Sequence, residues 1–284
     1  MVKTILVTGA TGQQGGATVR ALVESNKTVK EPFSILALSR NPTSDASIAL
    51  GKLENVEVVK GDLNEPDSID QLFEAHGPIY GVFSVQSTFV PGEETAQGNA
   101  LADLAAKHKV QHFVYTSTDY SGLAPHPVPH YEAKRLIEEH IHGLDLEWTI
   151  IRPGGFMSTF HWPPLLAAIT TMLRKDRRFP VIDVGDIGRA VATIFSDKES
   201  FVGKTIHLDG DEPTPSDVVE IFKELTGRDI SAKEPPDLGF PPMEKALKTI
   251  NEHAYIGTPE ETKKYFPWVK DLRTFVSENF PKEA

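Results

Sequence analysis

Short apolar runs and longer amphipathic segments alternate along the first 151 residues of the chain. Most of the runs are continuously apolar, which is typical of strands buried on both faces of a parallel sheet. We predict strands at Thr4–Thr8, Phe33–Leu38, Val56–Val59, Ile79–Val85, His112–Thr116 and Trp148–Ile151. Helical periodicity lies between them, at Gly15–Glu24, Ser44–Leu53, Pro66–Ala75, Glu93–Lys107 and His130–His142. This alternation predicts a doubly wound parallel α/β fold.

The alternation ends after Arg152-Pro153-Gly154-Gly155. For the rest of the chain we predict an aromatic helical stretch followed by a helix at Val184–Phe195. After these we predict a strand at Thr205–Leu208 and helices at Ser216–Leu225, Pro259–Tyr265 and Lys270–Phe280. Four prolines within Pro235–Pro242 predict a loop. We therefore expect a doubly wound domain formed by residues 1–152 plus 184–203. A small, mostly helical lobe would comprise residues 153–183 plus 204–284.

A glycine-rich turn, Gly9-Ala10-Thr11-Gly12-Gln13-Gln14-Gly15, follows the first predicted strand and opens the first helix. Gly9 would permit a tight turn, Gly12 would let the backbone approach a pyrophosphate, and Gly15 would let helix and strand pack closely. The amides at the helix start would then face the anion. The alternative is an ordinary glycine-rich βα turn. We predict a Rossmann domain whose cofactor contacts include Gly9, Thr11, Gly12, Gln13, Gln14 and Gly15.

The end of the second predicted strand indicates which dinucleotide binds. An acidic residue there would accept a hydrogen bond from the ribose 2′-hydroxyl of NAD, but Phe33–Ser44 contains no Asp or Glu. Arg40 suits the 2′-phosphate of NADP instead; otherwise it is a plain surface charge. Asp62, after the third strand, would reach the adenine or else cap the helix after Pro66. Val85 and Pro153, at the ends of the fourth and sixth strands, complete the expected cofactor contacts.

Composition narrows the class of protein. The chain lacks cysteine, so disulfides and Cys-ligated zinc are excluded, and its ten histidines form no HExxH motif, so we expect no metal site. A net charge of −11 argues against nucleic-acid binding, and no apolar stretch approaches the ~20 residues of a membrane span. The start of the chain has no signal-peptide pattern. We expect a cytoplasmic protein, or a nuclear one if it is a regulator.

Several motifs resemble the NmrA-like branch of the atypical short-chain dehydrogenase/reductases. They are GATGQQGG at Gly9–Gly16, SRNP at Ser39–Pro42, GDL at Gly61–Leu63, HYEAK at His130–Lys134, IRPGGFM at Ile151–Met157 and DVGDIGRA at Asp183–Ala190. The resemblance covers nearly the whole chain and implies an NADP(H) cofactor. Members of the branch include NADP-binding sensors and regulators, and its close relatives include NADPH-dependent reductases.

The resemblance also shows where this chain departs from the enzymes. In enzymatic short-chain dehydrogenases a Tyr four residues before a Lys donates the proton, whereas here His130 stands four residues before Lys134. Tyr131 lies three residues before Lys134, about 100° further round the helix. Ser117 is the expected counterpart of the usual Ser. Three alternatives stay open: Lys134 only binds the ribose, His130 (with an ordinary pKa of about 6.5) donates the proton, or His130 merely begins the helix.

Phe89, Phe156 and Phe160 are expected to line an apolar substrate pocket, although aromatic residues at the i, i+4 spacing of the last two more often belong to a core. From these observations we predict a cofactor-responsive, NADP(H)-binding regulator with a protein partner. The alternative is an NADPH-dependent reductase that uses His130 and Lys134 on a small apolar substrate, an aromatic carbonyl, quinone or enone.

Overall fold

The apolar runs form a sheet with the strand order β3-β2-β1-β4-β5-β6-β9, seen in a computed structural model that describes residues 3–86 and 91–282. Neighbouring strands from β3 to β6 pair in parallel. The strands are β1 Lys3–Val7, β2 Phe33–Ser39, β3 Val56–Lys60, β4 Gly81–Ser84, β5 His112–Thr116, β6 Trp148–Pro153 and β9 Lys204–Leu208. The predicted doubly wound Rossmann class is confirmed, and each predicted strand is present.

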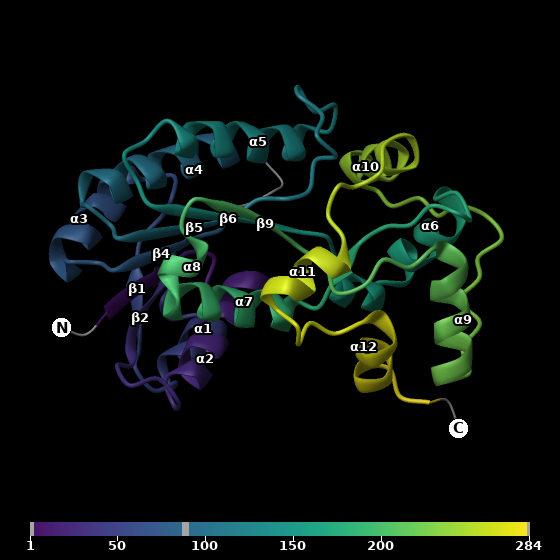
Figure 1. The fold of residues 1–284 in the computed structure, drawn as a ribbon, viewed down its shortest axis with the longest axis horizontal. Helices are drawn as coiled ribbons and strands as arrows, with labels where there is room; N and C mark the ends of the chain where they lie inside the picture. Colours follow the sequence, from purple (N-terminus) through teal and green to yellow (C-terminus); the bar gives the residue numbers. More distant parts are fainter. Residues whose placement is uncertain (1–2, 87–90, 283–284) are drawn as a thin grey trace. The chain divides into compact units, whose positions relative to one another are not determined.

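Helices cover both faces of this sheet (Figure 1). One face carries α3 Pro66–His76, α4 Pro91–Lys107 and α5 Pro129–His142, and the opposite face carries α1 Gln13–Ser25 and α7 Val184–Ser196. The short helices α2 Asp45–Gly51 and α8 Lys198–Phe201 follow β2 and α7. Ile69, Leu72 and Phe73 of α3 are buried against the sheet, together with apolar residues of α4 and α5. Apolar residues at helical spacing therefore build one face of the core.

Contacts divide the chain into two compact units. The first unit comprises residues 1–117, 133–151 and 187–206, and the second comprises residues 118–132, 152–186 and 207–284. Residues 118–132 thus group with the second unit, whereas the sequence-based boundaries kept them in the first domain. No local pattern marks this difference, because unit membership depends on contacts between distant segments.

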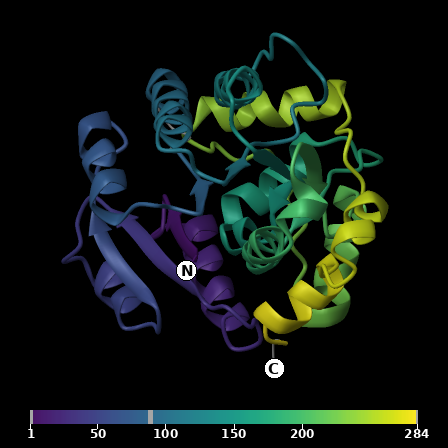
Figure 2. The same ribbon diagram turned by 60° about the vertical axis from the view of Figure 1, so that its left-hand side comes forward.

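The second unit is mostly helical and has its own apolar core. Its elements are β7 Gly155–Phe156, the 3-10 helix η1 Met157–His161, α6 Pro163–Met172, β8 Val181–Ile182, α9 Pro215–Thr226, α10 Pro241–Glu252, α11 Pro259–Tyr265 and α12 Leu272–Asn279. Strands β7 and β8 pair in parallel, and α12 lies beside α9 (Figures 1 and 2). The core packs Phe160 and Leu166 against Phe222 and Phe275.

Helix α10 and the small β7–β8 sheet are missing from the sequence-based prediction. The predicted loop Pro235–Pro242 ends early, because Pro241 and Pro242 form the start of α10. Proline is tolerated there because the first turn of a helix does not use its backbone N–H groups within the helix. None of the helices in residues 3–86 and 91–282 combines the length and apolar character that crossing a bilayer requires.

Candidate functional site

The glycine turn connects β1 to α1 in a tight conformation. Gly9 has a φ of +58°, which favours glycine, and the Gly12 N–H donates to the Gly9 carbonyl oxygen at 2.9 Å. A Cβ at Gly15 would overlap that same carbonyl oxygen. Close contact between helix and turn therefore requires glycine at position 15.

The start of α1 has the properties of an anion site. Thr11, Gly12 and Gln13 are exposed, and no side chain caps the helix at Gly12. Since the first N–H groups of a helix lack partners within the helix, they and the helix dipole favour a bound anion. A Cβ at Gly12 would meet only the Gly9 carbonyl oxygen, at 3.2 Å, so its other side is open. These features fit the pyrophosphate of a dinucleotide.

The turn lies where the strand order reverses, between β1 and β4. The Val85 N–H donates to the buried Thr8 hydroxyl at 2.7 Å, and that hydroxyl is 2.9 Å from the Val85 carbonyl oxygen. The Thr116 hydroxyl donates to the Gln14 side-chain oxygen at 2.7 Å. Hydrogen bonds thus join the glycine turn and α1 to the carboxyl ends of β4 and β5.

The segment after β2 presents Arg40 to solvent. The hydroxyls of Ser39 and Ser47 are 2.8 Å apart, and the Asn41 N–H donates to Ser39, so the backbone around Arg40 is held in place. Asp62 is half-buried, and its carboxylate accepts a hydrogen bond from the Asn64 N–H at 3.0 Å. The N-cap of α3 is Glu65. The interpretation of Asp62 as the cap of that helix is therefore wrong.

Lys134 is buried in the first unit and paired with an acid that the sequence analysis missed. Its ammonium lies 2.9 Å from the carboxylate of Glu94, whose side chain is fully buried, and donates to the Thr116 carbonyl oxygen at 3.5 Å. Burial raises the pKa of Glu94, while the charge of Lys134 and its hydrogen bond act in the opposite direction. Glu94 looks like an ordinary acid in a first helical turn, so only the packing of α4 against α5 reveals it.

Ser117, at the end of β5, is also in the first unit and is buried. Its backbone N–H donates to the Ile151 carbonyl oxygen at 2.8 Å. Its hydroxyl has no hydrogen-bond partner among residues 3–86 and 91–282. A buried hydroxyl without a partner is costly, which makes Ser117 a candidate ligand contact.

His130 and Tyr131 belong to the second unit. The Tyr131 hydroxyl is 3.1 Å from the Tyr255 hydroxyl, and burial raises the pKa of Tyr131. The His130 ring meets the Tyr131 ring edge-on, with centroids 4.7 Å apart. A proton-donating Tyr of a dehydrogenase needs a lowered pKa, so the environment of Tyr131 is unsuited to that role.

The remaining predicted residues differ in their burial within the described structure. Phe89 lies outside the described residues. Phe156 is half-buried in β7, whereas Phe160 is buried in the core of the second unit. Pro153 is buried at the end of β6. The structure thus gathers Gly9, Gln14, Val85, Ser117 and Lys134 in the first unit and places His130, Tyr131, Pro153, Phe156 and Phe160 in the second.

A buried acid cluster in the second unit was also missed. Asp119 accepts hydrogen bonds from the N–H groups of Ile256 and Gly257, and its carboxylate lies 3.2 Å from His207 Nδ1. Asp209 is fully buried, and neither carboxylate oxygen has a hydrogen-bond partner among the described residues. Burial raises the pKa of Asp209 to about 7. Burial would also raise the pKa of Asp119, but hydrogen bonds from His207 and from backbone amides lower it.

Comparison with known proteins gives the family. The model of the NmrA-like family matches residues 1–265. The chain belongs to the NmrA-like family. A Dictyostelium discoideum protein with an NmrA-like family domain is 28% identical over 249 residues, which cover 81% of this chain and 80% of that protein.

Two solved structures show the same fold at low sequence identity. NmrA, a negative transcriptional regulator in complex with NADP, has a TM-score of 0.79 at 23% identity and covers 98% of this chain and 95% of its own. Triphenylmethane reductase of Citrobacter sp., complexed with NADP(H), has a TM-score of 0.79 at 19% identity and covers 97% of this chain and 99% of its own. The NmrA-like fold therefore occurs in both a regulator and a reductase.

Proposed function

We propose that this NmrA-like protein binds NADP(H) through the first unit. Gly9, Thr11, Gly12, Gln13, Gln14 and Gly15 would hold the pyrophosphate, and Arg40 would contact the 2′-phosphate. The uncapped start of α1 and the open side of Gly12 support this assignment. Asp62 and Val85 would border the adenosine and nicotinamide halves. The NADP and NADP(H) complexes of the two fold neighbours are consistent with it.

We further propose that the protein is a cofactor-responsive regulator rather than a dehydrogenase. This proposal depends on Tyr131, which lies three residues before Lys134. The Tyr131 hydroxyl is hydrogen-bonded to the Tyr255 hydroxyl, and burial raises the pKa of Tyr131. Lys134 itself is paired with the buried Glu94 carboxylate. Lys134 would thus serve as a ribose ligand that Glu94 holds in place, and the Tyr131 hydroxyl, which is paired with Tyr255, would not act as its proton-donating partner.

One observation favours the alternative, an NADPH-dependent reductase of a small aromatic carbonyl, quinone or enone. The buried Ser117 hydroxyl has no partner among the described residues, as expected of a group that meets a reactant. NADPH would supply the hydride, and His130 would supply the proton.

The two functions are distinguished by turnover. Purified protein is mixed with NADPH and a panel of quinones, enones and aromatic carbonyls, and absorbance of the reduced nicotinamide is followed. For a regulator we expect no oxidation above the protein-free rate, together with different limited-proteolysis patterns with and without NADPH, because a ligand shifts a conformational equilibrium only through differential affinity.

Multiple turnovers on a defined substrate would overturn the regulator proposal. If His130 is then the proton donor, His130→Ala should lower the rate about a hundredfold or more. His142→Ala, an exposed histidine on the same helix, is the matched control and should leave that rate unchanged. Lys134→Ala should weaken NADPH binding under either function. Turnover that survives His130→Ala would argue for a different proton donor.

A further inference from the structure

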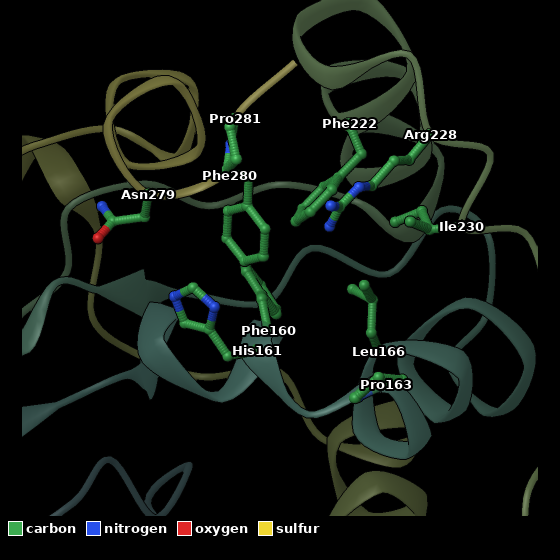
Figure 3. A pocket seen from close by; sticks show the side chains of 10 residues that line it. All are labelled: Phe160, His161, Pro163, Leu166, Phe222, Arg228, Ile230, Asn279, Phe280 and Pro281. Carbon is green, nitrogen blue, oxygen red and sulfur yellow. The ribbon is translucent and has the colours of Figure 1, made fainter. Parts of the chain in front are cut away.

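The cavity of about 380 Å³ in the second unit belongs to the apolar core of that unit (Figure 3). Among the rings that line it, Phe222 packs edge-on against Phe160 and Phe280. Hydrogen-bonding groups suited to orienting a polar ligand lie instead in the first unit, where β5 ends. Thr116, the last residue of β5, joins that end to the start of α1 through its side chain.

The sheet holds Thr116 firmly in place. The residue is fully buried and lies opposite Ile151 in the parallel pairing of β5 with β6. The ammonium of Lys134, which is itself paired with Glu94, donates to the Thr116 carbonyl oxygen at 3.5 Å. Because a β-branched side chain has restricted χ1 freedom, a fixed backbone at position 116 also fixes the hydroxyl.

The Thr116 hydroxyl engages one end of the Gln14 side-chain amide. It donates to Gln14 Oε1 at 2.7 Å, and Gln14 is the second residue of α1. Oε1 is thus bonded within the protein, whereas Nε2, which carries two N–H donors, has no hydrogen-bond partner among residues 3–86 and 91–282. Gln14 is half-buried and follows the exposed Gly12 and Gln13, where the free N–H groups of the helix start favour an anion. The amide therefore offers donors at the place where the pyrophosphate is expected.

We propose that Thr116 is a positioning residue for the dinucleotide and that it acts through Gln14. With Oε1 bonded to Thr116, the Nε2 group would donate to the pyrophosphate. Without the Thr116 hydroxyl the amide would rotate freely, and its oxygen would repel the anion whenever it faced the phosphates. This inference rests on the proposed binding of NADP(H), and it adds that the end of β5 orients a phosphate contact made from α1.

The test removes the hydroxyl and keeps the shape of the side chain, with Thr116→Val. We expect titration calorimetry to show that affinity for NADPH falls roughly threefold to tenfold, the usual effect of one lost hydrogen bond. Thr116→Ser, which keeps a hydroxyl, should restore most of the affinity. Thr149→Val is the matched control, because it removes a buried hydroxyl of β6 that donates to the Phe201 carbonyl oxygen, and it should leave affinity for NADPH unchanged. Affinity for 2′-AMP, which lacks the pyrophosphate, should be equal in the wild type and in Thr116→Val.

Gln14→Leu tests the same link from its other end and can be measured even if Thr116→Val fails to fold. It should lower affinity for NADPH at least as far as Thr116→Val does. The double variant should bind no more weakly than Gln14→Leu alone, because Thr116 acts through Gln14. Circular dichroism establishes that each variant is folded before titration.

Three results would overturn the inference: unchanged affinity for NADPH in Thr116→Val, unchanged affinity in Gln14→Leu, or a further loss in the double variant. An equal loss of affinity for 2′-AMP would also overturn it, because Thr116 would then support the first unit as a whole. A wild-type protein that binds no NADPH would instead refute the proposed cofactor function, so the two failures are distinguishable.

Discussion

At the scale of single residues, we propose that Arg40 determines the preference between the two nicotinamide dinucleotides. Its side chain is exposed at the end of β2, and no acid occurs between Phe33 and Ser44. We predict that Arg40→Ala lowers affinity for NADPH roughly tenfold to a hundredfold, because a charge-assisted contact contributes about 1.5–3 kcal/mol. Affinity for NADH should not change. Calorimetric titration of both dinucleotides measures this, with the exposed Lys52→Ala as the charge-matched control. Equal binding of NADPH and NADH by the wild type would contradict it.

Asp209 is a second residue with a testable role, since its burial should make the free energy of unfolding depend on pH. Its pKa is raised to about 7 by burial, and it faces His207, Asp119 and Glu212. In the unfolded chain the carboxyl titrates near its ordinary value of 3.8. The folded state therefore holds an extra proton between these values, and the free energy of unfolding must fall as pH rises from about 4 to about 7.

We therefore predict that Asp209→Asn stabilises the protein at pH 8 and that the gain disappears near pH 4. Each pKa unit corresponds to about 1.4 kcal/mol, so the gain should be on the order of a few kcal/mol. Asp119→Asn is the control and should destabilise the protein at pH 8, because the pKa of Asp119 is lowered and its carboxylate accepts several backbone hydrogen bonds. Urea unfolding across this pH range measures both. A gain that is independent of pH would show that Asp209 is charged when buried.

At the scale of elements, the β1–α1 turn contains two glycines whose substitution should have different effects. A Cβ at Gly15 overlaps the Gly9 carbonyl oxygen, whereas a Cβ at Gly12 comes only to 3.2 Å of it. We predict that Gly15→Ala strongly destabilises the fold. Gly12→Ala should melt within a few degrees of the wild type yet lose detectable NADPH binding, because its methyl group blocks the approach of the pyrophosphate. Thermal melts and calorimetry of both variants measure this, and NADPH binding by Gly12→Ala would contradict the proposed contact.

The elements also show how far sequence patterns reach. Strands β1 to β6 were predicted to within two residues at each end, because most are buried apolar runs whose pattern does not depend on their neighbours; β3, with exposed Glu57 and Lys60, is the exception. Helix α10 was missed since its first two residues, Pro241 and Pro242, complete a proline-rich segment. The same residue type that argues for a loop in one context begins a helix in another.

At the scale of the whole molecule, the two compact units are built from segments that alternate along the chain. Each consists of three segments in alternation, so the chain passes between the units five times, and α5 and α7 both cross a boundary. We predict a single calorimetric unfolding transition. NADPH at a hundred times its Kd should raise the stability by about 2.7 kcal/mol and shift that whole transition by several degrees. Two transitions, of which NADPH moves only one, would show that the units unfold independently.

The sequence by itself determined the Rossmann sheet and the glycine turn, because buried strands and left-handed glycines are set by local apolar runs and local backbone geometry. It also located Arg40 and the absence of a Tyr four residues before Lys134. Only the tertiary structure decided that Lys134 pairs with Glu94, that Tyr131 bonds to Tyr255, and that Asp209 is buried beside Asp119 and His207. The partners in these pairs are separated by about 40 to 125 residues in the sequence, except for Asp209 and His207, which are close together. Burial and charge pairing depend on which distant segments pack together, and no local pattern records that.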